Sequence, residues 1–287
     1  MEYIMVRLEQ VSKRMGTFLL KDITMELPEG YIMGLIGPNG AGKTTLLHLI
    51  MGLLELEDGR IEVMGKEFLN EEHAIRDDMG VVLQERLFQN RMTLQENAAF
   101  YGRYYKNYDE VYLKQLLKRF ELEPERRYKK LSKGEELKFQ FAFALAHHPR
   151  LLILDEPTGN FDPDFREEFF KALKEFIADG SRSVILATHL TEDLDRFADY
   201  ITYLDKGKLL FSQDIESLKE GFRLLSGETY KINLLPKENI IYMEKGEFGT
   251  RALIQHRRRF VYDKSLRVSY PTIEELMYFV TKGGKPC

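Results

Sequence analysis

The sequence predicts a doubly wound α/β fold, in which helices cover both faces of a mostly parallel sheet. Three short runs carry this prediction: YIMGLI at 31–36, LLILD at 151–155 and SVILAT at 183–188. Each run is almost wholly apolar, which is typical of a strand buried on both faces. Helical patterns separate the runs, and strands that alternate with helices form a doubly wound core.

The flanking segments predict further elements around this core. Residues 3–11 and 17–27 alternate in polarity and are expected to be strands, followed by a turn at 28–30. The middle of the chain, about 85–147, is expected to be helical. Apolar residues recur there at the helical spacing i, i+3, i+4, i+7, namely Leu113, Leu116, Leu117 and Phe120. One more apolar helix face follows the second run, formed by Phe165, Phe169, Phe170, Leu173, Phe176 and Ile177.

One segment of the middle region gives conflicting signals. Phe139, Phe141 and Phe143 alternate as they would in a strand. We nevertheless expect a helix over 134–147, because the alanines interleaved with these phenylalanines suit close packing. The family resemblance described below also requires a helix there.

The composition changes after about residue 220. Four short segments have the pattern of strands, and a final helix is expected from Thr272 to Val280, after Pro271. The expected strands are YKINLL at 230–235, NIIYM at 239–243, RALIQ at 251–255 and FVY at 260–262. We therefore expect residues 221–287 to form a small α+β domain.

Composition narrows the possible classes of function. Of 287 residues, 44% are hydrophobic and 31% are charged, and 42 Lys and Arg against 46 Asp and Glu give a net charge of −4. This balance is ordinary for a soluble globular protein and lacks the basic excess of proteins that coat nucleic acid. The one cysteine, Cys287, allows no intrachain disulfide, which fits a reducing cytosol.

Membrane features are also missing from the sequence. The first residues show no signal-peptide pattern. The longest apolar stretch, 46–54, is too short to span a bilayer and contains His48 and Gly52. We therefore expect any membrane role to require a separate partner.

A glycine-rich loop after the first buried run predicts a nucleotide site. The run at 31–36 leads into GPNGAGKTT and then into an apolar helical stretch, which is the context that a phosphate loop requires. Glycines let main-chain N–H groups turn toward an anion, and the helix N-terminus adds positive potential. Lys43 is expected to reach the β- and γ-phosphates, and Thr44 to bind Mg²⁺. The expected binding residues of the loop are Gly37, Pro38, Asn39, Gly40, Ala41, Gly42, Lys43, Thr44 and Thr45.

Two acids at the end of LLILDEP complete the predicted chemistry. Asp155 ends the expected strand and can hold Mg²⁺ directly or through water. Glu156 is the next residue, so its side chain points elsewhere and can act as general base on an attacking water. The alternatives are a chance glycine turn at the loop and a pair of surface acids at a strand end. The two motifs together favour the nucleotide site.

The order of the motifs resembles the ATP-binding cassettes of ABC proteins. After the phosphate loop come Gln84, LSKGE at 131–135, LLILDEP, TGNFDP at 158–163 and His189. Ser132 lies 23 residues before Asp155, and His189 lies 33 residues after Glu156. The resemblance covers about residues 3–220. Within the family, the sequence looks most like the ATPases of bacterial exporters of drugs, antibiotics or peptides.

The resemblance implies a domain plan, cofactors and a dimer. An ABC-type phosphate-loop NTPase core, with an antiparallel β subdomain and a helical subdomain at about 85–147, would occupy residues 1–220, ahead of the small domain at 221–287. ATP and Mg²⁺ are the implied cofactors. Two cassettes, in a homodimer or a heterodimer, would face each other head to tail. Each ATP would then lie between one phosphate loop and the other chain's LSKGE, where Ser132 and the Gly134 amide meet the γ-phosphate.

LSKGE departs from the common family motif at two positions. The family commonly has glycine at the position of Lys133 and glutamine at the position of Glu135. Lys133 is expected either to point toward solvent or to add positive charge near the phosphate. We expect the two departures to affect the fine tuning of the activity more than the activity itself, because Ser132 and Gly134 are retained.

Three further residues take their expected roles from the resemblance. Gln84 matches the residue that senses Mg²⁺ and the attacking water, His189 matches the switch histidine at the γ-phosphate, and Asp162 matches the loop that crosses the dimer interface. Alone, each would be a structural residue at a strand end or a helix start. The expected catalytic residues are Glu156, His189, Gln84 and Lys43, and the expected Mg²⁺ ligands are Thr44, Gln84 and Asp155.

The adenine contact has two candidates. Family members commonly stack a tyrosine on the base shortly after the first strand. The matching position here is Met15, and Phe18 is the nearest aromatic residue. Aromatic stacking on a base contributes about 1–3 kcal/mol, against about 0.3–1.5 kcal/mol for a sulfur–aromatic contact. With Met15 at this position we expect a weak adenine contribution and modest discrimination between ATP and GTP, and Phe18 remains the alternative.

Two surface features carry weaker expectations. The aromatic-rich stretch from Phe88 to Tyr108 either offers a groove to a short helix of a membrane subunit or belongs to the core. The basic run at 256–259 (HRRR) either touches lipid headgroups or a partner, or forms a solvated hairpin turn. Four residues are few for a polybasic anchor, which favours the turn.

The predicted function is ATP binding and hydrolysis in an ABC transporter, with the chain peripheral on the cytoplasmic face of the membrane. The expected partners are a second cassette and separate transmembrane permease subunits, and no nucleic acid is expected. A soluble ABC ATPase acting on nucleic acid or ribosomes typically has two cassettes in one chain or a long coiled coil, and this sequence has neither. A non-hydrolysing regulatory partner usually lacks Glu156 or His189, and both are present.

Overall fold

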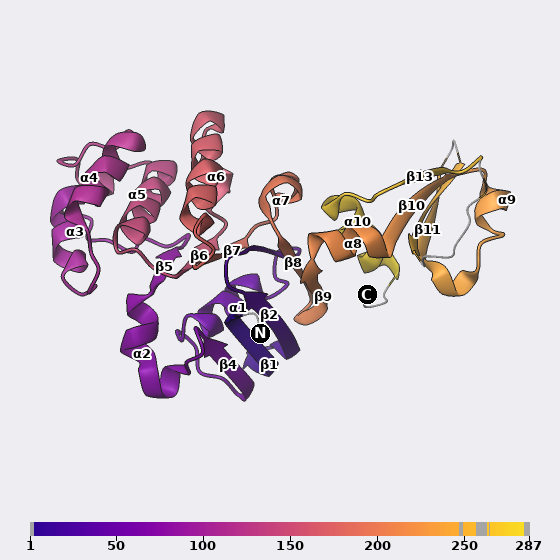
Figure 1. Ribbon diagram of the computed structural model, residues 1–287, viewed down its shortest axis with the longest axis horizontal. Coiled ribbons are helices and arrows are strands. Elements are labelled where there is room, and N and C mark those ends of the chain that lie inside the picture. Colours follow the sequence, from indigo (N-terminus) through magenta and orange to yellow (C-terminus); the bar gives the residue numbers. More distant parts are fainter. Residues whose placement is uncertain (1–2, 247–248, 257–262, 264, 284–287) are drawn as a thin grey trace.

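The computed structural model describes residues 3–246, 249–256, 263 and 265–283. A six-stranded sheet lies at the centre of the first three quarters of the chain, in the order β5–β6–β7–β3–β8–β9. Figure 1 shows β5 to β9 beside the helical region and the antiparallel sheet. The first five strands are parallel, and β9 runs antiparallel to β8. The strands are β3 (Ile32–Ile36), β5 (Met79–Val82), β6 (Leu151–Asp155), β7 (Ser183–Ala187), β8 (Tyr200–Asp205) and β9 (Lys208–Asp214).

The central strands bury both faces of this sheet, as their apolar sequences predict. Along β6, Leu152 and Leu154 pack on the side of the helical region, while Leu151 and Ile153 pack on the opposite side. This alternation follows from the two-residue period of a strand. Because both faces are covered, no polar alternation appears in the sequence, and the predicted doubly wound α/β core is confirmed.

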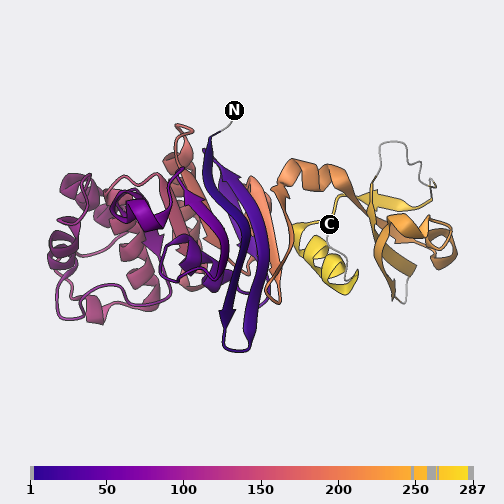
Figure 2. The same cartoon turned by 90° about the horizontal axis from the view of Figure 1, so that it is seen from below.

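A second, antiparallel sheet covers one side of the core, in the order β2–β1–β4. Its long first two strands run side by side through the middle of Figure 2. They form a hairpin in which Met15 pairs with Phe18, and Gly16, at φ +61°, occupies the turn. The elements are β1 (Ile4–Met15), β2 (Phe18–Pro28) and β4 (Asp58–Val63), with α1 (Lys43–Ile50) and α2 (Phe68–Asp77) beside them.

Helices form the opposite end of the molecule from the C-terminal sheet (Figure 1). The segment at 134–147 is helical, as expected, although its phenylalanines alternate. Phe139 packs on Phe88 and Tyr128, whereas Phe141 packs on Phe120 and Phe169. A helix that is covered on all sides needs no amphipathic period. The helices are α3 (Leu94–Gly102), α4 (Glu110–Arg119), α5 (Lys133–Ala146), α6 (Pro163–Ile177) and α7 (Thr191–Phe197), with short 3₁₀ turns η1 (Tyr128–Lys130) and η2 (Pro157–Asn160).

The last quarter of the chain forms a four-stranded antiparallel sheet in the order β11–β12–β10–β13. Helix α10 joins it to the core, because Phe279 and Val280 belong to the same apolar cluster as the core helices. The Ile273 N–H also donates to the Asp195 carboxylate of α7. The elements are α8 (Ile215–Gly221), β10 (Phe222–Gly227), α9 (Thr229–Ile232), η3 (Lys237–Asn239), β11 (Ile240–Gly246), β12 (Gly249–Gln255), β13 (Arg267–Ser269) and α10 (Ile273–Gly283).

One expected strand in this region is wrong. YKINLL at 230–235 begins in the short helix α9 and continues as a turn. The Glu228 carboxylate pairs with Lys231 at 2.9 Å one turn later, and the helix buries Ile232 against the sheet while Tyr230 stays exposed. The strands expected at 239–243 and 251–255 and the final helix are confirmed, and the one expected at 260–262 lies outside the described residues. The domain boundary at 220/221 falls at the end of α8 and stays a prediction.

None of the helices in the described part of the chain has the length and apolar character needed to cross a bilayer.

Candidate nucleotide-binding and catalytic site

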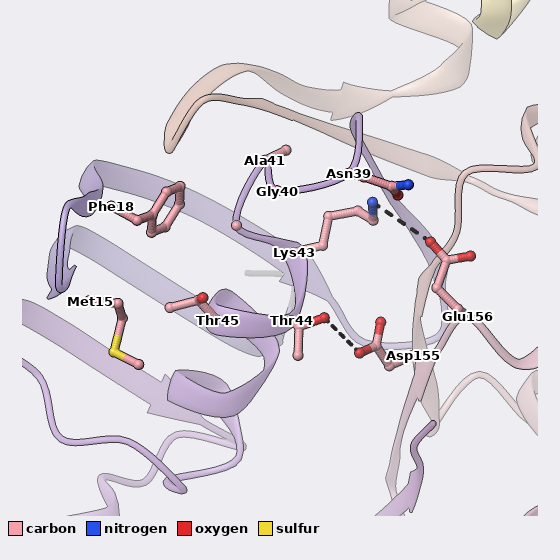
Figure 3. A pocket seen from close by; sticks show the side chains of 11 residues that line it. Met15, Phe18, Asn39, Gly40, Ala41, Lys43, Thr44, Thr45, Asp155 and Glu156 are labelled. Atoms are coloured by element: carbon pink, nitrogen blue, oxygen red, sulfur yellow. Dashed lines mark hydrogen bonds and ion pairs between the residues drawn. The ribbon is translucent and has the colours of Figure 1, made fainter. Parts of the chain in front are cut away.

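The predicted phosphate loop lines a cavity of about 430 Å³ at the end of β3. Figure 3 shows Met15 and Phe18 at one end of this cavity and Asp155 and Glu156 at the other, with the loop between them. The antiparallel hairpin supplies the first pair, and the end of β6 supplies the second. The lining residues are Met15, Phe18, Asn39, Gly40, Ala41, Gly42, Lys43, Thr44, Thr45, Asp155 and Glu156.

Glycine is required where the loop turns into α1. Gly42 precedes the helix at φ +110°, in a region that other residues avoid. A Cβ atom there would lie 2.8 Å from the Phe18 ring. The loop therefore packs closely on the hairpin, and the N-terminus of α1 faces the cavity.

The Lys43 side chain is held along the loop. Its Nζ donates to the carbonyl of Gly37 at 2.8 Å and lies 3.7 Å from Glu156 Oε1. The residue is only 7% exposed. A buried ammonium with this anchoring is a fixed positive charge at the point where phosphate oxygens are expected.

Asp155 and Thr44 make the second contact across the cavity. The Thr44 hydroxyl donates to Asp155 Oδ2 at 2.8 Å. The other oxygen, Asp155 Oδ1, is buried and has no hydrogen-bond partner among the described residues. Burial raises the pKa of the Asp155 carboxyl, the Thr44 hydrogen bond opposes this rise, and the nearby Glu156 carboxylate adds to it. A buried, unsatisfied carboxylate oxygen beside a hydroxyl is a donor set suited to a hard cation such as Mg²⁺.

Glu156 points away from Asp155 because its main chain changes direction. Its φ and ψ of 50° and 44° are left-handed, which is uncommon for a residue with a side chain. Its N–H donates to the carbonyl of Ala187 in β7, which holds this conformation. The carboxylate then lies between Lys43 and His189, with His189 Nδ1 at 2.7 Å from Oε2. The expected divergence of the two acids is thus present.

Gln84 lies beside this site without lining the cavity. Its Nε2 donates to the carbonyl of Glu156 at 2.6 Å. Gln84 and His189 each form a hydrogen bond with Glu156, although neither of them lines the cavity.

None of the LSKGE residues lines the cavity: at the start of α5, Leu131 is buried in the core, Ser132 is exposed and the other three are partly exposed. Exposed Ser132 caps the helix, and its hydroxyl accepts the N–H of Glu135. Glu135 in turn accepts the N–H of Ser132 at 2.8 Å and pairs with Arg126. Burial would raise the pKa of Glu135, but these hydrogen bonds and the Arg126 guanidinium hold it below its ordinary value. A glutamate at this position therefore completes a capping box.

The Lys133 side chain makes contacts within its own chain instead of pointing freely into solvent, and its expected positive charge near the phosphate stays a prediction. Its ammonium donates to the main-chain carbonyl of Gln84 and lies 3.8 Å from the Glu136 carboxylate. The side chain is thus directed inward along α5 rather than into solvent. Sequence reasoning missed this contact because Gln84 is distant in the chain.

Gly134 and Asp162 also lie outside the cavity. A Cβ atom on Gly134 would lie 2.5 Å from the Asn160 carbonyl, so this close packing requires glycine. Asp162 caps α6 through the N–H of Phe165 and pairs with Lys138 at 3.3 Å. The helix-start alternative for Asp162 is therefore present, and its side chain is still more than half exposed.

The aromatic stretch from Phe88 to Tyr108 contains both core and surface residues. Phe88 is buried against Phe139 and Phe143, whereas Tyr104 is 70% exposed. A second cavity of about 630 Å³ lies beside it, lined by His73, Ala74, Arg76, Asp77, Tyr101, Arg103, Tyr104, Tyr105 and Lys106. Of the basic run at 256–259, the arginines lie outside the described residues.

Known proteins resemble this chain over most of its length. The family model described as "ABC transporter" matches residues 20–159. The ABC transporter ATP-binding protein YtrB of Bacillus subtilis is 28% identical over 250 residues, covering 86% of this chain and 85% of that protein. The Nod factor export ATP-binding protein I of Rhizobium leguminosarum is 30% identical over 253 residues, covering 84% and 81%.

Solved structures give the same relationship. A dimeric ATP-binding cassette in a post-hydrolysis state, bound to ADP and Pi, is 26% identical with a TM-score of 0.65, covering 74% of this chain and 99% of that one. The cbiO1 protein of Clostridium perfringens, part of the ABC transporter complex cbiONQ, is 25% identical with a TM-score of 0.63, covering 75% and 89%.

Proposed function

This chain belongs to the ATP-binding subunits of ABC transporters, and from that premise we propose that it drives export by Mg²⁺-dependent ATP hydrolysis in a head-to-tail pair of cassettes. Its family binds ATP and couples ATP hydrolysis to transport.

One observation carries the proposal. Thr44 and Lys43 of the phosphate loop face two adjacent carboxylates, and these carboxylates diverge. Asp155 bonds to Thr44 at 2.8 Å, while Glu156 turns toward Lys43 and His189. We propose that Asp155 holds a cation and that Glu156 accepts a proton, which are the two tasks of phosphoryl transfer to water.

The residues fit Mg²⁺. Thr44 and Asp155 would hold it, with Asp155 Oδ1 as a free buried oxygen, and Gln84 is the proposed further ligand. When bound, the ion neutralises charge that builds up on the phosphate oxygens.

Glu156, Lys43 and His189 each have one proposed role in hydrolysis. A water oxygen attacks the γ-phosphorus, its proton passes to the Glu156 carboxylate, and the bond to the β-γ bridging oxygen breaks to release ADP. The proposed role of Lys43 is to hold the β- and γ-phosphates. His189, already hydrogen-bonded to Glu156, orients this base and contacts the γ-phosphate.

The second half of each site would come from the other cassette. Ser132 and the Gly134 amide lie at an exposed helix N-terminus, which attracts anions. The Ser132 hydroxyl accepts a hydrogen bond from Glu135, so its own proton is available to a phosphate oxygen. Asp162 is the proposed interface residue beside it.

Export through separate membrane subunits is the proposed output. The Nod factor export proteins among the relatives support this direction. The cavity lined by Tyr101 and Tyr104 is the proposed docking site for a short helix of the permease, because the exposed Tyr104 ring beside Arg103 and Lys106 suits an interface. The chain would then work peripherally on the inner face of the membrane.

The test is Glu156→Gln in the full chain. We expect kcat to fall by about 10²–10⁴-fold, the typical effect of losing a general base. ATP binding should persist, and an ATP-held dimer should accumulate on size-exclusion chromatography with ATP and Mg²⁺. A variant that hydrolyses ATP at the wild-type rate would overturn the assignment.

A further inference from the structure

Polar side chains on one face of α5 form hydrogen bonds and an ion pair with the segment that carries Gln84. We propose that these contacts position Gln84 for hydrolysis. The side chains belong to Lys133, Glu136 and Gln140, which lie at i, i+3 and i+7 and so share one helix face. We call these three residues the Gln84 clamp. The inference rests on the proposed function, because Gln84 takes its catalytic role from it.

Gln140 forms the inner end of the clamp. Its Oε1 accepts the N–H of Leu83 at 2.8 Å, and its Nε2 donates to the carbonyl of Glu85 at 2.9 Å. These two residues flank Gln84, just after β5 ends. The Gln140 side-chain amide thus satisfies one main-chain N–H and one main-chain carbonyl, as the main chain of a neighbouring strand would. Because Gln140 is 1% exposed, water is poorly placed to replace these bonds.

Glu136 forms the middle of the clamp. It is 1% exposed, and a buried carboxylate requires positive partners. Arg86, two residues after Gln84, supplies one guanidinium nitrogen at 2.6 Å from Oε1, and the Lys133 ammonium lies 3.8 Å from Oε2. Neither Glu136 oxygen has a hydrogen-bond partner among the described residues, so Glu136 holds Arg86 and Lys133 near the helix through charge.

Lys133 forms the outer end and touches Gln84 itself. Its ammonium donates to the Gln84 carbonyl, while the Gln84 side chain donates to the Glu156 carbonyl at 2.6 Å. A continuous set of contacts thus leads from the first turn of α5 to the main chain of the proposed general base.

The position of the clamp on α5 gives it a second consequence. The same helix turn begins with Ser132, which is proposed to meet the ATP held by the other cassette. The Lys133 contact connects this helix end to Gln84, so we expect a shift of the helix end to move Gln84 as well. Lys133, Glu136 and Gln140 are therefore positioning residues that join the LSKGE motif at the start of α5, which we call the signature, to the hydrolytic site in the same chain.

The test measures kcat, the KM for ATP and the ATP dissociation constant in the full chain. Lys133→Met and Gln140→Met should each lower kcat by about tenfold, which corresponds to about 1.4 kcal/mol. ATP affinity should stay unchanged, and Lys133→Arg should restore kcat because arginine can donate to the same carbonyl. Lys114→Met, which removes an exposed lysine paired with Glu110 on α4, is the matched control and should leave kcat unchanged.

A double-variant comparison separates positioning from general damage. In a Gln84→Ala background, Lys133→Met should cause no further loss, because the clamp acts through Gln84. Losses that multiply in this background, or wild-type kcat in Lys133→Met, would overturn the inference. Lys133→Met decides the matter even if Gln140→Met fails to fold, because the Lys133 side chain is 34% exposed. If Glu156→Gln is inactive while both clamp variants keep wild-type kcat, the inference fails and the proposed function stands.

Discussion

The phosphate-loop half of the site and its signature half differ in how complete each is within one chain. In the first, Lys43 and Asp155 are buried, and Thr44–Asp155 and Glu156–His189 contacts already connect the side chains. In the second, Ser132 is exposed at the N-terminus of α5. Ser132 and Glu135 of the same helix cap this end through two reciprocal hydrogen bonds. We therefore propose that the first half binds ATP alone, whereas the second acts on a phosphate held by another chain.

This difference predicts two classes of variant. Changes around Asp155 and Met15 should alter a single chain, and they should be visible in binding or stability without a partner. Changes at Ser132 should be visible only in turnover by a dimer.

Asp155→Asn gives the largest expected effect on the first half. Hydrolysis should be lost, because the proposed ligand carboxylate is gone, yet the nucleotide-free protein should become more stable. The pKa of Asp155 is raised by burial, so its ionised form destabilises the folded state at neutral pH. This destabilisation disappears as the pH falls through the raised pKa.

Thermal unfolding at several pH values checks this expectation. The Tm of Asp155→Asn should exceed that of the wild type at pH 7, where the wild-type carboxyl is ionised against the effect of burial. The gain should shrink toward acid pH. Asp164→Asn, at an exposed aspartate, is the control. A lower Tm for Asp155→Asn than for the wild type at pH 7 would contradict the claim that burial destabilises the ionised Asp155 carboxylate.

Met15→Tyr gives a smaller effect at the other end of the same cavity. Met15 is 44% exposed in the cavity, whereas the Phe18 ring lies against the loop at Gly42. A tyrosine at 15 should stack on adenine and tighten ATP binding about 10-fold, equivalent to about 1.4 kcal/mol. Dissociation constants for ATP and GTP measure this. Tight, ATP-selective binding that survives Met15→Ala and collapses on Phe18→Ala would assign the contact to Phe18 instead.

The sequence predicted the parts of the fold that depend on local pattern. Buried runs such as LLILD gave the central strands, because a strand covered on both faces must be apolar throughout. The C-terminal sheet was harder. YKINLL has strand-forming residues, but a local Glu228–Lys231 pair and burial of Ile232 favour a helical turn. Strand β13 is exposed throughout and has no apolar pattern to detect.

The site was predictable in its residues and less so in its contacts. Motif order indicated Lys43, Thr44, Asp155 and Glu156, because phosphate chemistry fixes those types at those spacings. The left-handed main chain of Glu156 was not predictable, since glutamate gives no signal for it. The contacts of Lys133 and Gln140 with the Gln84 segment join residues 49 to 57 positions apart, which no local pattern reveals.

The central claim is that each ATP site is shared between two chains, and mixing two defective variants tests it most directly. Ser132→Arg leaves its own phosphate loop intact, and Lys43→Ala leaves its own signature intact. Each alone should be inactive in hydrolysis, while Ser132→Arg should still bind ATP.

In an equimolar mixture, a head-to-tail heterodimer has one site with both defects and one with neither. Random pairing makes about half of the dimers mixed, so ATPase activity should return to about a quarter of the wild-type rate. Activity no higher than that of the separate variants, or full-rate hydrolysis by isolated wild-type monomers, would contradict the shared site.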